Sequence, residues 1–176
     1  MKVKVTMTTT PLCIIAYVGE GEQYDAVVDG AMEAATGAEA RLIIYDADAG
    51  SRLGSPLATF WSGETDSASQ PNILSVQQLQ AAGRSDIAGR VSTARGRGID
   101  AVGWLPESRG AKGFAKYAEE QQADLLVIPS DLEHTGVWHR LLGVPTAEGI
   151  VNETPVPVVT VDVDGKLGAV SIAESA

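Results

Sequence analysis

The residues best suited to chemistry lie in the last third of the chain, in a loop between two apolar runs. The apolar run 124–128 leads into polar residues 130–135, and Gly136, Gly143 and Thr146 follow. Glycines let backbone amides approach phosphate oxygens, and a hydroxyl at a helix start lies where anions are favoured. A strand, a long loop, a helix start and a second strand form the layout of a binding crevice at the carboxyl edge of a parallel sheet. We therefore expect this stretch to form the binding site.

Other reactive residues give weaker indications. His134 and His139 have a spacing typical of no familiar zinc site. The Gly-Glu-Gly segment 19–21 begins like a dinucleotide fingerprint, but Tyr24 replaces the third glycine, so we expect a plain turn. Asp46 ends an apolar run on the crevice side, where it would either touch a ribose or cap a loop. No Ser-His-Asp or Cys-His order supports a nucleophile, so we expect no catalytic residues and no metal site.

Composition excludes several function classes. The chain has 176 residues, 44% of them hydrophobic, and a formal net charge of −10. Nucleic-acid affinity is built from clustered Lys and Arg, so this charge argues against such a partner. Cys13 is the single cysteine and has apolar neighbours, which indicates a buried, inert thiol. No segment resembles a signal peptide or a membrane span, so we expect a cytoplasmic protein without membrane contact.

Five apolar runs predict five strands, at residues 13–18, 42–45, 101–105, 124–128 and 156–161. Amphipathic stretches separate them, and strands joined by crossover helices require a parallel sheet with helices on both faces. The sequence therefore predicts an α/β fold, doubly wound and Rossmann-like, in which a five-stranded parallel sheet is the middle of three α/β/α layers.

The expected domain spans residues 12–164. A flexible leader, 1–11, precedes it, and a flexible tail, 165–176, follows it. The connector 47–72 shows no periodicity and is long for a compact domain, which indicates a lid or a flap.

Several residues predict where helices begin and end. Ser75 and Gln78 form a capping-box pattern that opens a helix, which Gly83 weakens in its middle. Gly37 stands where a C-terminal glycine ends the first helix, and Thr146 can cap a last short helix.

The last predicted strand contains Pro157, which cannot donate to a ladder, so we expect this strand at the edge of the sheet. An uncovered apolar edge invites pairing with a second copy. The predicted dimer interface consists of Val156, Val158, Val159 and Val161.

Three segments together resemble the universal stress protein family. They are Ala123–Ile128 (Ala-Asp-Leu-Leu-Val-Ile), Arg140–Gly143 (Arg-Leu-Leu-Gly) and Pro155–Val159 (Pro-Val-Pro-Val-Val). The resemblance covers about residues 12–163. It implies the adenine nucleotide alpha hydrolase-like fold with strand order 3-2-1-4-5, a homodimer formed through the last strand and a cytoplasmic role in stress response. It also implies, for some members, an adenine nucleotide such as ATP or AMP in the crevice.

The nucleotide-binding members carry glycine, two residues, glycine, nine residues, then glycine and Ser or Thr. Gly143 matches the third glycine, but the first two positions fall on Ser130 and Glu133, and Val144 replaces the hydroxyl residue. Aligned instead from the end of the central strand, the same positions fall on Pro129 and Leu132, which are not glycines either. A carboxylate about 4 Å from a phosphate repels it by roughly 4 kcal/mol at an effective dielectric near 20. The helix-terminus attraction recovers only about 0.3–1 kcal/mol.

These patterns favour a non-enzymatic stress-response or regulatory protein that acts through protein partners or a small ligand, without tight ATP binding. The alternative is an ATP- or AMP-binding regulator that uses an altered loop. An enzyme acting on adenylated compounds would rest on fold analogy alone. The candidate nucleotide-binding residues are Gly19, Asp46, Ser130, Gly136, Gly143, Val144 and Thr146.

Overall fold

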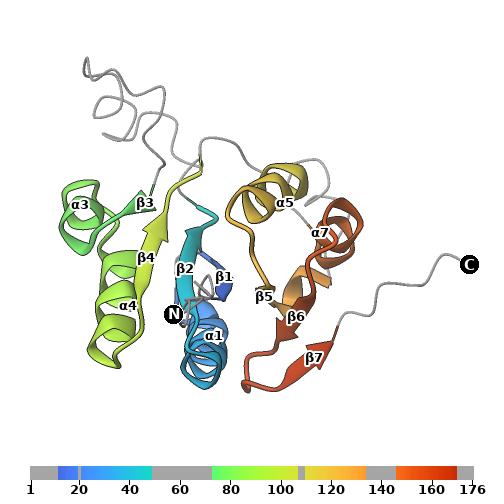
Figure 1. Cartoon of the computed structure of the whole chain (residues 1–176), viewed down its shortest axis with the longest axis horizontal. Coiled ribbons are helices and arrows are strands. Elements are labelled where there is room, and N and C mark those ends of the chain that lie inside the picture. Colours follow the sequence, from blue (N-terminus) through green and yellow to red (C-terminus); the bar gives the residue numbers. More distant parts are fainter. Residues whose placement is uncertain (1–11, 20, 49–72, 107–109, 134–145, 170–176) are drawn as a thin grey trace, which may run out of the picture.

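The computed structural model describes residues 12–19, 21–48, 73–106, 110–133 and 146–169 (Figure 1). They form one sheet with strand order β3-β4-β2-β1-β5-β6-β7. The five inner strands run parallel, and β3 and β7 pair antiparallel at the two ends. The strands are β1 (Cys13–Val18), β2 (Arg41–Asp46), β3 (Ile73–Leu74), β4 (Ala101–Trp104), β5 (Leu125–Pro129), β6 (Val158–Val161) and β7 (Leu167–Ala169).

Helices cover both faces of the sheet, as Figure 1 shows. One face, which we call the α4 face, packs against α1, α3 and α4 around a mainly aliphatic core. The other, the α5 face, packs against α5 and α7 around a core rich in aromatic rings. The helices are η1 (Glu22–Tyr24), α1 (Asp25–Ala38), α3 (Val76–Ala81), α4 (Ser85–Gly96), α5 (Ala111–Glu120), η3 (Ser130–Glu133) and α7 (Ala147–Glu153). No helix in these described ranges is long and apolar enough to cross a bilayer.

The predicted architecture is confirmed, and the predicted strand count is wrong. The parallel strands β4-β2-β1-β5-β6 reproduce the expected order 3-2-1-4-5. The sheet has seven strands instead of five, because β3 and β7 extend it at its two ends. These two strands have two and three residues, too few to give a periodic signal in the sequence.

The prediction that the last long strand lies at the sheet edge is wrong. β7 pairs with β6 from Val159 to Val161 and covers the side that was expected to be open. Pro157 is tolerated because it precedes β6, and only its carbonyl oxygen enters the ladder, as acceptor from the Leu126 amide at 2.9 Å. Of the four valines proposed for the dimer interface, Val156, Val158 and Val161 are buried within this chain and Val159 is half-buried.

The expected tail is also corrected in part, since residues 167–169 form β7. Residues 170–176, the leader 1–11 and the connector from residue 49 to 72 lie outside the described residues.

Local signals for helix ends give mixed results. The Ser75 and Gln78 capping box and the Thr146 cap are both confirmed. The helix expected to run through Gly83 is divided there into α3 and α4, because Gly83 adopts φ +73°. α1 does not end at Gly37: it continues to Ala38, and Glu39 takes the left-handed position with φ 51°, its amide donating to Ala35 and Thr36.

Candidate functional site

The candidate site lies at the carboxyl edge of the sheet, between the chain segments that follow β1 and β5. β1 pairs with β2 on one side and with β5 on the other, so the connections diverge here as they do at the switch point of doubly wound folds. The structure describes Gly19, Asp46, Ser130 and Thr146 from the predicted set. The predicted residues Gly136, Gly143 and Val144 lie outside the described residues.

The end of β1 is filled by the chain's own side chains. A Cβ atom added to Gly19 would lie 2.6 Å from Asp48 Oδ2 and 2.6 Å from Cε2 of the Tyr24 ring. Real Cβ atoms do not approach other atoms so closely, so only glycine fits between these two groups. Tyr24 also packs against the cores of both faces of the sheet. Its ring therefore occupies the place where the two halves of the fold meet.

The turn after β1 is held from α4 by Arg90. Arg90 Nη1 donates to the Gly19 carbonyl at 2.8 Å, and Nη2 donates to the Gly21 carbonyl at 2.7 Å. Nη2 also reaches Asp25 Oδ1 at 3.1 Å. Gly21 has φ 108°, in the region that favours glycine. Arg90 thus holds both ends of the predicted turn 19–21, whose middle residue, Glu20, lies outside the described residues.

Asp46, at the end of β2, is bonded to a second arginine of the same segment. Arg84, the N-cap residue of α4, donates from Nε to Oδ2 at 2.6 Å and from Nη2 to Oδ1 at 2.7 Å. The Asp48 amide donates to Oδ1 at 3.1 Å. Asp46 is 0% exposed; burial raises the pKa of its carboxyl, and the bonds with Arg84 oppose that rise. The bond from the Asp48 amide agrees with the loop-capping role, one of the two roles predicted for Asp46. Contact with a ribose, the other role, stays a prediction.

Ser130 and Thr146 lie on the β5 side of the site. Ser130 opens η3 directly after β5 and is half-buried. The Thr146 hydroxyl accepts from the Gly149 amide at 2.9 Å and so caps α7. Their proposed part in nucleotide binding also stays a prediction.

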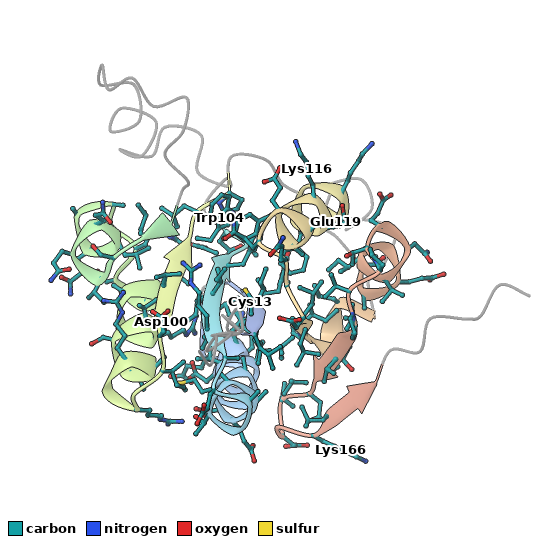
Figure 2. All side chains as sticks on the ribbon, viewed as in Figure 1. Cys13, Asp100, Trp104, Lys116, Glu119 and Lys166 are labelled. Atoms are coloured by element: carbon teal, nitrogen blue, oxygen red, sulfur yellow. The ribbon has the colours of Figure 1, made fainter. Side chains whose placement is uncertain are left out.

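A row of aromatic side chains lies behind the site on the α5 face. Tyr17, Tyr45 and Trp104 stand at one register position on three neighbouring strands. From α5, Phe114 meets the edges of the two tyrosines at 5.4 and 4.6 Å, and Tyr117 stacks on Trp104 at 3.7 Å between ring centroids. Figure 2 shows Trp104 beside α5, whose Lys116 and Glu119 point away from the sheet. The sequence did not indicate this row as a unit, although an aromatic residue lies at or next to the end of each of these three strands.

Two polar atoms in this aromatic group lack partners. Trp104 Nε1 and the Tyr117 hydroxyl are buried and make no hydrogen bond in the described structure. Burial raises the pKa of Tyr117 far above its ordinary value of 10.

The remaining chemistry of the described residues is limited. Cys13 is buried, as predicted, and burial raises the pKa of its thiol. Across the described ranges, no three His, Cys, Asp or Glu side chains come together in a way that could hold a metal ion.

Comparison with known proteins identifies the fold. No protein-family model matches the sequence, and no curated protein matches it. Solved structures do match: a universal stress protein in complex with cAMP has a TM-score of 0.55 at 18% identity, covering 88% of this chain and 99% of that one. A universal stress protein from Archaeoglobus fulgidus in complex with dAMP has 0.51 at 13% identity, over 85% and 95% of the two chains. Universal stress protein UspA from Lactobacillus plantarum has a TM-score of 0.53 at 16% sequence identity, covering 86% of this chain and 98% of that one. The fold implied by the sequence resemblance is therefore confirmed.

Proposed function

We propose that this chain is a non-enzymatic regulatory protein of the universal stress type that does not bind adenine nucleotides tightly. The shared fold and the sequence resemblance support the first part. The proposal of weak nucleotide binding rests on the position of Tyr24, whose ring lies against Gly19 at the end of β1. A ligand entering at this point would have to displace that ring from the cores of both faces.

The charges around the end of β1 support the same proposal. Carboxylates of Asp25 and Asp48 lie beside the turn: Asp48 Oδ2 stands next to Gly19, and Asp25 Oδ1 contacts the same Arg90 nitrogen as the Gly21 carbonyl. The two arginines nearby are bonded within the chain, Arg84 to Asp46 and Arg90 to backbone carbonyls and Asp25. Among the described residues, a phosphate at this turn would therefore meet carboxylates, while the guanidinium groups of Arg84 and Arg90 are already bonded within the chain.

The alternative is a regulator that binds ATP or AMP through an altered loop. The complexes of structural neighbours with cAMP and dAMP favour this alternative. Gly136, Gly143 and Thr146 would then supply backbone amides and a hydroxyl, and Tyr24 would move aside.

Equilibrium dialysis with labelled ATP and AMP, with and without Mg²⁺, separates the two proposals. We expect no binding by the wild-type chain up to about 1 mM, an affinity limit of about −4 kcal/mol. We expect the Tyr24→Ala variant to bind AMP more tightly than wild type, because it removes the ring that fills the site. A sub-micromolar Kd for the wild-type chain would establish the alternative.

We also propose that the chain forms a homodimer in the cytoplasm. Because β7 covers β6, the pairing edge is β7 itself, next to Val163 and Leu167, which are 73% and 61% exposed. Sedimentation velocity at tens of micromolar tests this, since functional dimers commonly dissociate near micromolar concentrations. A monomer throughout that range would contradict the dimer.

A further inference from the structure

The Arg90 side chain connects two parts of the fold that are far apart in sequence. It extends from α4 to the turn after β1, and the residues it joins are separated by 65 to 71 positions. Its side chain is 12% exposed, whereas the Asp25 side chain that it also contacts is 61% exposed. The bonds to the two glycine carbonyls are the shorter ones, at 2.8 and 2.7 Å. Arg90 is therefore fixed mainly by the backbone of the turn.

Those two bonds determine the shape of the turn. A peptide group is planar, so a bonded carbonyl fixes the orientation of the whole plane. Arg90 holds the carbonyl groups of Gly19 and Gly21, and Gly21 has φ 108°. Without a bond at each plane, glycines in such a turn have several accessible conformations.

The shape of this turn also determines the position of Tyr24. The Gly21 carbonyl that accepts from Arg90 also accepts from the Tyr24 amide, at 3.4 Å. The arginine and the start of η1 thus share one acceptor, and the Tyr24 ring is held against Gly19. Movement of the Gly21 carbonyl would move the first residues of η1 with it.

We propose that Arg90 is a positioning residue that latches the turn after β1, so that Tyr24 closes the end of β1 against a planar ligand such as an adenine ring. The proposal rests on the proposed function, because it explains how the closed form is maintained. It assigns to Arg90 a role that a brace between helices would not have. A residue that only braced the helices would contribute to global stability, whereas a latch residue fixes the conformation of one turn and so controls access to the site.

Three variants separate the latch from a brace. Arg90→Ala removes all three contacts, and Arg90→Lys keeps the charge but lacks the planar fork that reaches two carbonyls at once. Arg97→Ala is the matched control, because Arg97 also extends from the α4 end to α1, where it pairs with Asp29 at 3.6 Å, one helical turn beyond Asp25, and not with the Gly19 or Gly21 carbonyls that Arg90 holds. The readouts are amide hydrogen exchange and dialysis with AMP.

In Arg90→Ala we expect the amides of Gly21 to Asp25 to exchange at least about tenfold faster, with α5 amides unchanged, since local opening is independent of global unfolding. We expect Arg90→Ala to bind AMP with a Kd of about 0.1 mM or lower, at least about tenfold below the limit of about 1 mM up to which the wild-type chain should show no binding. Arg90→Lys should behave as Arg90→Ala, and Arg97→Ala as wild type.

Three results would overturn the latch: unchanged exchange in the turn of Arg90→Ala, equal acceleration in every helix, or faster exchange without tighter AMP binding. Tight AMP binding by the wild-type chain would contradict the proposed function, and the latch would still be judged by the difference between variant and wild type.

Discussion

The buried charges of the α4 face and the aromatic group of the α5 face differ in how their polar atoms are satisfied. On the α4 face, the charged groups of Asp46, Arg84 and Arg90 bond to one another or to backbone carbonyls. On the α5 face, Trp104 Nε1 and the Tyr117 hydroxyl are buried with no partner in the described residues. An unsatisfied buried polar group costs about 1–3 kcal/mol, whereas a satisfied one does not.

This difference indicates what each face does. The arginines of the α4 face join the ends of β1 and β2 to α4, so the polar contacts there fix loops at the candidate site. The rings of the α5 face are held by buried apolar area, which is non-directional, and by ring contacts between strands and α5, none of which bonds a loop. Removing a buried polar group should therefore lower the free energy of unfolding on the α4 face and raise it in the aromatic group of the α5 face.

The largest effect is expected for Asp46→Ala on the α4 face. The change leaves the Arg84 guanidinium, 4% exposed, without its bidentate partner. We expect the free energy of unfolding to fall by about 3–5 kcal/mol, as measured by urea unfolding at pH 7. A loss below about 1 kcal/mol would show that this pair does not hold the α4 face together.

The second-largest effect is expected at alkaline pH, where the buried tyrosines of the α5 face should lower the free energy of unfolding. Burial raises the pKa of both Tyr45 and Tyr117 above their ordinary value of 10. The unfolded chain loses these protons near pH 10 while the folded chain keeps them, so the free energy of unfolding falls as pH rises. Each tyrosine contributes about 1.4 kcal/mol per pH unit, and two contribute about 2–3 kcal/mol between pH 10.5 and 11.5. Stability that is flat over this interval would contradict the burial of these hydroxyls.

Tyr117→Phe should stabilise the chain, in contrast to the polar deletion on the other face. It removes a hydroxyl that has no partner in the described part of the structure and retains the ring that stacks on Trp104. We expect a gain of about 1 kcal/mol in urea unfolding at neutral pH, and a smaller loss of stability above pH 10. Destabilisation would show that the hydroxyl is bonded in solution and that the contrast between the faces is false.

The smallest effect is expected on the exposed side of α5. Lys116 and Glu120 form an ion pair at 3.7 Å with side chains 76% and 55% exposed. Lys116→Ala should change the free energy of unfolding by no more than about 0.5 kcal/mol. A larger loss would mean that charge on this surface, and not only buried charge, supports the fold.

The sequence was sufficient for features that are local or strongly periodic. Buried runs such as 13–18 predicted strands because both faces of a central parallel strand are apolar. The capping box at Ser75 was visible because its partners are three residues apart. The short strand β7 was not visible, since Leu167, Gly168 and Ala169 form no pattern of their own and pair only after β6 is in place.

The candidate site was predicted only in part, for a different physical reason. Asp46 was correctly placed at the end of a strand, but its partner Arg84 is 38 residues away. Gly19 and Gly21 were recognised as a turn, yet nothing near them indicates that Arg90 would hold their carbonyls. Such partners depend on how helices pack on the sheet, which no local pattern encodes.

The account depends on the closed end of β1, and a crystal structure grown with millimolar AMP tests it most directly. We predict that the Tyr24 ring will remain against Gly19, with Arg90 bonded to both glycine carbonyls and no nucleotide between the end of β1 and Ser130. An adenine ring in the place of Tyr24 in the wild-type chain would contradict the account.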